Sequence, residues 1–496
     1  MRRLVCLLSI REGGEMSYEQ ERASRIGHVP TALSPAVVDA MERWQTPALE
    51  VGEPEHITRR VTAISSLQRD QRPVPAFAIA FDGSNQEVEA RPGYPSVRVG
   101  YIQIAGVYVD IMKFLGANRS GLVDARELER AQVTQTVNSV LPGSNVFLSG
   151  ITGRDTWRAE FDRSFSASSI TDFGSSFSLT DALMTIHGRP GAPASSLTLS
   201  KCPTCGAAGQ RVTASGGACT VADCMAPLYP TDVLRGYEEF SEDGENALTL
   251  TRAMNMAERL LLISYIDGFY RVAPERLAQG IFITDGPLAV YGPAAPMKSK
   301  FLDYWTKLCA ALEQRNIAPP LLVGIEKTGR FVDHARVIER HIPDGHVMML
   351  DTPYINRYIT NKKPEHHYGK DEFYGRRFIY KTTTSEMLVV TVPRVPGGHP
   401  YEAPLRGHDG EFIQLPSEQY ASYPTLKVTL ETLDRMQTQL YPNAVIPVAL
   451  AHSASSLPLG TGRSVLTLLA QKSLGMPQDS IGLSRFKPPK QSYNGR

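Results

Sequence analysis

Two short apolar stretches, far apart in the sequence, end in the same way. Residues 76–81 are apolar and run into Asp82 and a Gly-Ser pair, and residues 280–284 run into Asp285 and a glycine. Each pattern predicts a buried strand that ends at its aspartate, where the following glycine turns the chain away. A carboxylate at the end of a core strand is costly unless a positive charge faces it. We therefore expect the two aspartates to form the fixed part of a cation site.

Between and after these stretches the pattern alternates between strand and helix. Residues 96–110 alternate between apolar and polar side chains and predict one or two strands beside the first one. Residues 246–266 predict a strong helix with one apolar face. That face comprises Leu250, Met254, Ala257, Leu261 and Tyr265. A helix over 301–312, a buried strand over 321–325 that delivers Glu326 and Lys327, and a helix over 332–342 follow. The alternation predicts an α/β fold.

The remaining segments carry weaker signals. Residues 17–70 are expected to be helical, with Ser34 as the N-cap and Pro35 as the first residue of a helix. Residues 116–200 mix helical and serine-rich stretches, which predicts an irregular insertion with some helix, and 190–200 are expected to be a linker. Residues 376–381 and 387–393 predict a hairpin. Residues 445–451 predict a strand that leads into His452 and that Pro447 restricts to a sheet edge. Residues 464–474 predict a helix.

These signals divide the chain into five segments: a helical segment at 1–70, the first part of an α/β core with an irregular insertion at 71–195, an inserted zinc ribbon at 196–240, the second part of the core at 241–476 and a disordered tail at 477–496.

Composition is ordinary for a globular protein, with 42% hydrophobic and 21% charged residues. The net charge of +1 offers no global attraction to nucleic acid, so any such surface must be local. The basic and apolar start is too short for a signal peptide, and Met16 competes with Met1 as the first residue. No stretch approaches the length of a membrane-spanning helix, so we expect a cytoplasmic protein without membrane contact.

Four of the six cysteines fall close together, which is a metal-binding pattern rather than a disulfide framework. Cys202 and Cys205 form a Cys-Pro-Thr-Cys-Gly knuckle, and Cys219 and Cys224 follow after a short polar segment. Two such pairs provide four thiolates for a tetrahedral Zn²⁺, in a closed site whose role would be structural. Four reduced cysteines in a loop are the alternative. The adjacent His366 and His367 are expected to face solvent.

The predicted strand ends bring hard ligands together. Asp82 and Asp285, with Glu258 from the edge of the apolar helix face, suit Mg²⁺ or Mn²⁺. Two such ions about 4 Å apart would bind a scissile phosphate and activate water. Lys327 and His452 would stabilise charge on the phosphate. An ordinary salt bridge is the alternative for Glu258, and the Asp-Gly dipeptide alone is a common turn.

The sequence resembles the NurA nuclease family at several points, in the correct order over residues 77–474. The matching stretches are Phe81-Asp-Gly-Ser84, Ile283-Thr-Asp-Gly-Pro-Leu288, Val323-Gly-Ile-Glu-Lys-Thr328, Tyr374-Gly-Arg-Arg-Phe378 and Ala449-Leu-Ala-His452. The resemblance implies an RNase H-like mixed sheet flanked by helices, and a metal-dependent DNA endonuclease and 5′-3′ exonuclease. It also implies a homodimer that docks on a hexameric HerA-like ATPase translocase.

By position, the resemblance matches Asp82 and Asp285 to the two strand acids, Glu258 to the helix acid, and Lys327 and His452 to the later basic residues. Glu258 lies far before Asp285 in the sequence, so Asp267 remains a competing assignment. The cysteine segment and the serine-rich stretch before it depart from the family pattern.

The leading hypothesis is therefore a Mn²⁺- or Mg²⁺-dependent deoxyribonuclease in DNA repair or phage defence. The sequence has no Gly-x-x-x-x-Gly-Lys-Ser/Thr loop, so translocation must come from a partner, which we expect to dock on residues 17–70 or the C-terminal region. One alternative is a catalytically inactive zinc-ribbon subunit that binds nucleic acid or acts as a scaffold. Another is an unrelated phosphoryl-transfer enzyme. The sequence leaves open a preference for DNA or RNA and the polarity of cutting.

Overall fold

The computed structural model describes residues 29–44, 55–70, 72, 74–90, 97–117, 132–174, 176–363, 366–401, 405–406, 412–413, 417–437, 445–457 and 461–474. The chain divides into two compact units, residues 1–52 and 53–496. The first unit contains α1 (Val29–Ala32) and α2 (Pro35–Arg43). Pro35 is the first residue of α2, as predicted, and Ser34 is at the N-cap position, although its side chain makes no capping hydrogen bond.

The second unit is built on a sheet of nine strands in the order β1-β11-β12-β13-β10-β9-β2-β3-β4. In chain order these strands are β1 (Val61–Ala63), β2 (Phe77–Glu89), β3 (Arg98–Asp110), β4 (Gln132–Pro142), β9 (Gly280–Asp285), β10 (Leu321–Glu326), β11 (His346–Met349), β12 (Arg376–Lys381) and β13 (Met387–Val392). The helices of this unit are α3 (Glu55–Thr58), α4 (Ile111–Ala117), α6 (Gly153–Ala167), α7 (Leu179–His187), α8 (Ala247–Val272), α9 (Lys298–Glu313), α10 (Arg330–Ile338), α11 (Thr352–Ile355), α12 (Leu426–Arg435), α13 (Ile446–Ser455) and α14 (Thr461–Ser473).

Five of the strands form the RNase H-like part of the sheet that the resemblance implied. β2, β3 and β4 pair antiparallel in sequence order, while β9 and β10 run parallel to β2 on its other side. Numbered along the chain, these strands lie in the order 3-2-1-4-5, which is that of an RNase H-like sheet. The mixed sheet and its flanking helices confirm the predicted α/β fold class.

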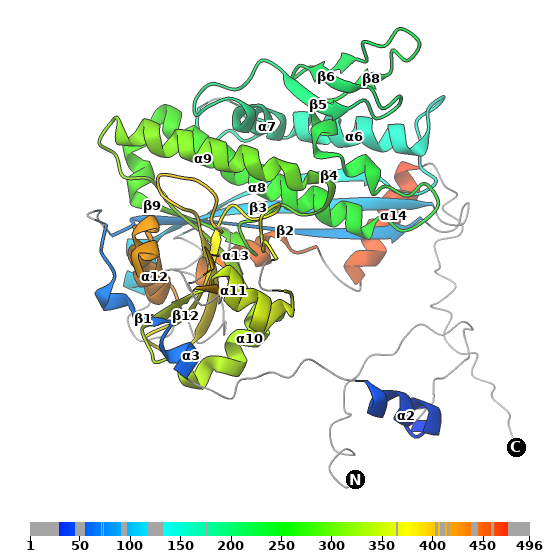
Figure 1. The fold of residues 1–496 in the computed structure, drawn as a ribbon. Helices are drawn as coiled ribbons and strands as arrows, with labels where there is room; N and C mark the ends of the chain where they lie inside the picture. Colours follow the sequence, from blue (N-terminus) through cyan, green and yellow to red (C-terminus); the bar gives the residue numbers. More distant parts are fainter. Residues whose placement is uncertain are drawn as a thin grey trace, which may run out of the picture. The chain divides into compact units, whose positions relative to one another are not determined.

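Strand alternation sends the two faces of β2 into different cores. Phe77, Ile79 and Phe81 face α8, within a core that α6, α7 and α9 complete. Ala78 and Ala80 face the opposite core, which α12 and α13 cover. Figure 1 shows these helices in separate layers on the two sides of the sheet. A third core lies between α10, α11 and the strands β11 to β13.

The strand that carries Asp82 is longer than predicted. β2 does not end at Asp82 but continues to Glu89, paired with β3 over its whole length. Gly83 is therefore not a turn residue. A Cβ atom on Gly83 would lie 2.7 Å from Oε1 of Glu258 and 2.9 Å from Cγ of Met254, so the glycine allows α8 to approach the strand closely.

Other predictions fail where local signals conflict with long-range pairing. Residues 61–63, expected in a helix, pair with β11 as β1. The stretch expected to be an irregular insertion contains β4, which completes one edge of the sheet, and the expected linker contains the start of β5 (Leu197–Lys201). Residues 446–455 form α13 instead of an edge strand, and Pro447 lies in its first turn, where proline favours a helix start.

The predicted helix at 246–266 and the strand at 321–325 are confirmed as α8 and β10, and the predicted hairpin is confirmed as β12 and β13. The predicted tail at 477–496 and both candidate start residues lie outside the described residues. No helix among the described residues is long and apolar enough to span a membrane.

Candidate metal centre

Parallel pairing of β2 with β9 brings the two predicted aspartates together. The last registered pair of these strands is Phe81 and Thr284, so Asp82 and Asp285 follow side by side. Asp82 is buried, whereas Asp285 is partly exposed at the end of its strand. One carboxylate oxygen from each aspartate and one ring nitrogen of His452 all lie within 4.8 Å of one another.

His452 is far from both aspartates in the sequence but lies beside them in the fold. It lies on α13, and its Nδ1 is hydrogen-bonded to Oδ2 of Asp82 at 2.8 Å. When Asp82 is ionised it accepts this bond, and Nε2 is then the nitrogen that can exchange a proton or bind an ion. The side chain of His452 is 63% exposed, so the imidazole forms the solvent side of the cluster.

Two hydrogen-bonding side chains that were not among the predicted site residues hold α13 in place. The Ser84 hydroxyl donates to the Ser455 carbonyl and accepts from the Leu457 amide at 2.9 Å. Nε2 of Gln103 donates to the Ala454 carbonyl at 2.7 Å. Because both Ser84 and Gln103 lie on sheet strands, they fix the C-terminal end of the helix that carries His452.

Lys327 is the positive charge of the cluster. It follows β10, and its Nζ lies 2.8 Å from Oδ2 of Asp285. The preceding residue, Glu326, is not available as a further ligand, because it forms a bidentate pair with Arg377. The Arg377 guanidinium also stacks on the ring of Phe331, with its central carbon 3.8 Å from the ring centroid.

Glu258 lies on α8, behind Asp82 and Gly83, and is buried. Its Oε2 lies 3.7 Å from Nη1 of Arg259. Arg259 also donates to the Ala289 carbonyl at 2.6 Å and to the Pro287 carbonyl at 3.2 Å. Arg259 therefore ties the loop after Asp285 to the helix that carries Glu258, a role that no local sequence pattern indicated.

Negative charge accumulates in this cluster. Burial, followed by the charge of Asp285, raises the pKa of Asp82, although Lys327 and the hydrogen bond to His452 act to lower it. Burial raises the pKa of Glu258 well above its ordinary value; Arg259 lowers it, and Asp82 and Asp285 raise it further. Three carboxylates with Lys327 beside them are thus a site that an added cation would stabilise.

The competing acid, Asp267, lies elsewhere. Its Oδ1 accepts from the Gly191 amide at 2.8 Å and from the Tyr304 hydroxyl at 3.3 Å, and its Oδ2 lies 3.1 Å from Nε of Arg271. These partners account for its burial without any part in the cluster. Of the two candidate helix acids, the structure brings only Glu258 towards Asp82.

The donor set fits a hard or borderline divalent ion. Carboxylate oxygens and an imidazole nitrogen are ligands that Mn²⁺ and Mg²⁺ accept, and this group of residues contains no cysteine among the described residues. Asp82, Asp285 and His452 could hold such an ion directly. Their roles as ligands remain predictions, as do those of Glu258 and Lys327.

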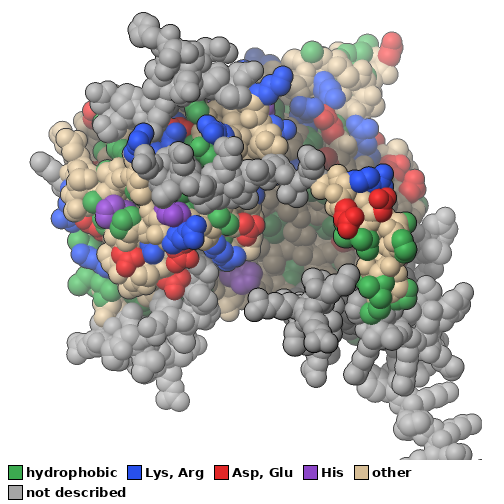
Figure 2. Space-filling model, turned by 60° about the horizontal axis from the view of Figure 1, so that its bottom comes forward, with side chains coloured by type: hydrophobic (Ala, Val, Ile, Leu, Met, Phe, Trp, Pro, Cys, Tyr) green, Lys and Arg blue, Asp and Glu red, His purple; other side chains and the backbone are tan. Residues whose placement is uncertain are grey.

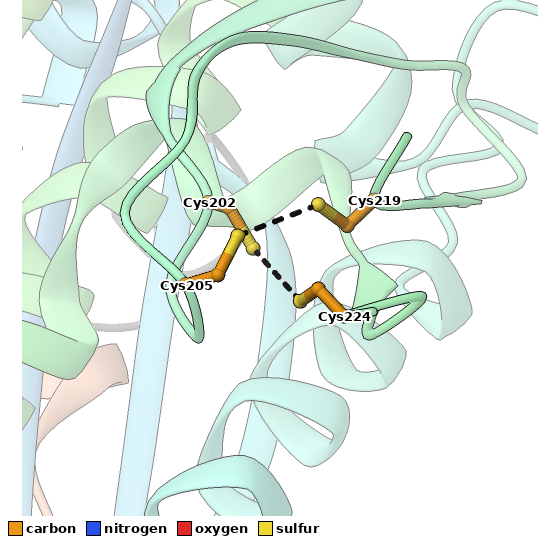
Figure 3. A group of neighbouring side chains, drawn as sticks. All are labelled: Cys202, Cys205, Cys219 and Cys224. Atoms are coloured by element: carbon orange, nitrogen blue, oxygen red, sulfur yellow. Dashed lines mark hydrogen bonds between the residues drawn. The ribbon is translucent and has the colours of Figure 1, made fainter. Parts of the chain in front are cut away.

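The four predicted cysteines also come together, in a separate place. Figure 3 shows the sulfur atoms of Cys202, Cys205, Cys219 and Cys224 pointing towards a common centre. Their sulfur atoms all lie within 4.8 Å of one another. This confirms the predicted four-cysteine cluster. His366 and His367 are exposed, as expected.

Comparison with known proteins finds similar solved structures but no matching family model. No protein-family model matches the sequence, and a search of curated proteins finds no match. This chain is similar to a crystal structure of the NurA nuclease from Sulfolobus solfataricus. The match covers 92% of this chain and 98% of the NurA chain, with 9% sequence identity and a TM-score of 0.35. The match with a second NurA crystal structure covers 91% of this chain and 98% of that NurA chain, with 10% sequence identity and a TM-score of 0.27.

Proposed function

We propose that this chain is a nuclease, more closely a Mn²⁺- or Mg²⁺-dependent deoxyribonuclease that hydrolyses phosphodiester bonds. The observation that carries the proposal is the pair of carboxylates on neighbouring parallel strands, Asp82 and Asp285, with His452 within 4.8 Å and Glu258 buried behind them. A structural ion pair does not need two carboxylates side by side with a third buried behind them, whereas such a set of hard ligands suits divalent ions that support phosphoryl hydrolysis.

Each residue has a distinct task in this proposal. Asp82 and Asp285 hold the ion or ions, with Glu258 supporting the inner side of the site. The bound metal would lower the pKa of a water molecule and stabilise charge on the phosphate and the leaving oxygen. Lys327 is positioned by Asp285 to contact a non-bridging phosphate oxygen. His452, oriented by Asp82, can transfer a proton at the exposed edge of the site.

Charge distribution supports dependence on a partner for work on long DNA. Figure 2 shows Lys and Arg side chains interspersed with Asp and Glu on the face that it draws. With a net charge of +1, non-specific attraction to DNA is expected to be weak and sensitive to salt. We therefore propose a homodimer that acts with a hexameric HerA-like ATPase, as the sequence resemblance implies.

Nicking of supercoiled plasmid tests the proposed activity. Wild-type protein should nick the plasmid with Mn²⁺ or Mg²⁺ and not with EDTA, and Asp82→Asn or Asp285→Asn should abolish nicking because each removes a ligand charge. Asp303→Asn is the matched control, since Asp303 is exposed and pairs only with Lys307 among the described residues. If the Asp82 and Asp285 variants cut as fast as wild type, the site assignment is wrong. Binding of DNA without cutting by wild type would favour the inactive, scaffold-type alternative.

A further inference from the structure

The cysteine cluster has the geometry of a metal site rather than of disulfides. The sulfur atoms of Cys202 and Cys224 are 3.9 Å apart, and those of Cys205 and Cys219 are 3.6 Å apart. A disulfide needs about 2.05 Å. Four sulfurs about 2.3 Å from a central zinc ion, arranged as a tetrahedron, lie about 3.8 Å from one another. The observed spacing therefore matches a four-thiolate zinc site.

The backbone around each cysteine pair is shaped to point the sulfurs inward. The amides of Thr204 and Cys205 donate to the Cys202 sulfur, and the Gly206 amide donates to the Cys202 carbonyl at 3.0 Å. The Val221 amide donates in the same way to the Cys219 sulfur. The turn of the first pair ends on Gly206, at φ +77°. Amide hydrogen bonds of this kind stabilise thiolates, which are the form that binds a metal.

The surrounding strands are too short to hold this arrangement unaided. β5 and β6 (Ala208–Val212) form one two-stranded sheet, and β7 (Gly217–Ala218) and β8 (Pro227–Leu228) form another. Two-stranded sheets are only marginally stable in water. The cysteines lie at the ends of these hairpins, so a single ion would join the two sheets.

Both halves of the ribbon, here defined as residues 197–228, are attached to one helix. Nη2 of Arg154 on α6 donates to the Pro203 carbonyl at 3.1 Å, and Nη2 of Arg158 donates to the Pro227 carbonyl at 2.8 Å. Arg158 also forms a buried bidentate pair with Asp232. In Figure 1 the ribbon lies on the outer side of α6 and α7, away from the sheet that carries Asp82.

We propose that Cys202, Cys205, Cys219 and Cys224 bind one structural Zn²⁺, which clamps the two halves of the ribbon together on α6. The site is closed, because four thiolates fill the tetrahedral coordination of zinc and leave no position for substrate. The chain thus carries two chemically different metal sites. The sulfur site retains a soft or borderline ion, and the carboxylate site exchanges hard ones.

Metal content of the full-length protein tests the binding. We expect about one zinc per chain by elemental analysis, retained after dialysis against EDTA that removes Mn²⁺ and Mg²⁺. Cys205→Ser and Cys219→Ser should lose the zinc, whereas Cys309→Ala should keep it, because Cys309 is buried in α9 outside the cluster. Asp82→Asn should also keep it, which separates this proposal from that of the nuclease site. Stoichiometric iron, or zinc that persists in both serine variants, would overturn the assignment.

A second measurement does not depend on the folding of any variant. Titration of wild-type protein with an organomercurial should release one zinc per chain as four thiols react, detected with a colorimetric chelator. Hydrogen exchange on the released protein should then accelerate within 197–228 and stay unchanged in β2 and β9. Acceleration throughout the sheet would contradict a local clamp, and mercurial reaction without zinc release would contradict zinc binding.

Discussion

Because Gly83 has no side chain, the buried carboxylate of Glu258 can lie close to β2. It lies within β2, one residue after Asp82, and the space that a Cβ atom would take is filled by Glu258 and Met254 of α8. The sequence pattern Asp-Gly suggests a turn here, because glycine is the usual turn residue. The structure gives a different reason for the glycine. It allows a helix carboxylate to approach a strand carboxylate, which is what the proposed metal site needs.

Replacing Gly83 with alanine should therefore damage the site as well as the packing. We expect Gly83→Ala to displace Glu258 and to reduce metal-dependent cutting about 10–100-fold, as loss of supporting contacts around a metal does. Gly100→Ala is a matched control, because its Cβ would lie 2.4 Å from Cδ2 of Leu250, on the same helix but away from the carboxylates. Thermal melts and nicking rates of both variants provide the measurement. Equal loss of activity at equal stability would show that the approach of Glu258 is irrelevant.

Glu258→Gln should change stability and activity in opposite directions. Because burial and the neighbouring carboxylates raise the pKa of Glu258, its ionised form opposes folding in metal-free protein. The folded state binds the proton more tightly, so stability falls as pH rises from the unfolded pKa through the folded one. The Glu258→Gln variant has no carboxyl group to ionise at this position, so it does not lose stability in this way as pH rises. We expect its urea midpoint in EDTA to exceed that of wild type, more so at pH 8 than at pH 5.

The same variant should lose cutting activity with Mn²⁺, since the carboxylate is the group that the metal needs. Added Mn²⁺ should stabilise wild type more than the variant, because ligand binding to the native state raises stability. Asp267→Asn should not reproduce this pattern, as Asp267 has other partners. A less stable variant in EDTA at both pH values would instead mark Glu258 as part of an ordinary salt bridge.

Among single residues, sequence reasoning identified those whose chemistry is visible beside a strand. Asp82, Asp285 and Lys327 follow or continue apolar runs, and the structure brings them together. The sequence analysis assigned no role to Arg259 or Arg377, because an arginine near an apolar stretch is most often a solvated surface residue. Their partners, the loop after Asp285 and Glu326, come from other strands and appear only when the sheet is assembled.

At the scale of elements, α13 shows the limit of short apolar patterns. Residues 445–451 are almost continuously apolar, and a run of this length cannot distinguish a strand from a buried helix segment. Pro447 was interpreted as a mark of a sheet edge, but it lies in the first turn of the helix. The predicted site residue His452 nevertheless lies beside Asp82, because either element would place it at the end of the apolar run.

The buried ion pair between Arg158 of α6 and Asp232 should contribute strongly to the stability of the fold. Arg158 and Asp232 are 1% and 2% exposed, so removing Arg158 leaves the buried Asp232 carboxylate without its ion pair. We expect Arg158→Leu to lower the unfolding free energy by about 3–5 kcal/mol. Arg163→Leu on the same helix should change it by less than about 1 kcal/mol, because Arg163 and its partner Glu160 are exposed and half-buried respectively. Urea titrations of both variants test this difference.

The end of α7 should make stability depend on pH. His187 lies in the last turn of α7, where burial, and next the charge of Lys300, lowers its pKa to about 4. Since its unfolded pKa is about 6.5, the unfolded state binds the proton more readily between these values. Stability should therefore fall as pH falls from about 6.5 to about 4, by at most roughly 3 kcal/mol from this group.

A neutral residue at this position should remove that part of the pH dependence. His187→Gln is expected to flatten the curve of unfolding free energy against pH between about 6.5 and about 4. His346→Gln is the control, because His346 lies at a strand end and bonds a nearby carbonyl. A curve for His187→Gln that is as steep as that of wild type would assign the pH dependence to other groups.

For the whole molecule, the existence of the central strands followed from local pattern, but their order in the sheet and the edge strands did not. β2, β9 and β10 are apolar runs flanked by turns or helices, so their existence was predictable. β1 pairs with β11, which is far away in the sequence, and β4 lies within a segment of weak sequence signals. Both strands also have a mixed composition. Pairing partners stabilise such strands, and no single stretch of sequence contains that information.

At this scale the proposed partnership predicts how the protein works on long DNA. The isolated chain should degrade linear duplex slowly and with low processivity, and addition of a HerA-like hexamer with ATP should accelerate degradation. Asp285→Asn should abolish cutting but still co-migrate with the hexamer in size-exclusion chromatography. Equal rates with and without the motor and ATP, together with no co-migration, would leave a stand-alone nuclease as the better description.

The residues of the carboxylate cluster are spread along nearly the whole chain. Asp82 and its partner His452 are 370 positions apart, and β2 finds its parallel neighbour β9 only after residue 280. A ribosome makes a chain from its N-terminus at about 5–20 residues per second. The nascent chain therefore contains Asp82 for tens of seconds at the slower rate before His452 exists. If the cluster cuts DNA as proposed, its complete set of residues cannot assemble until translation is almost finished.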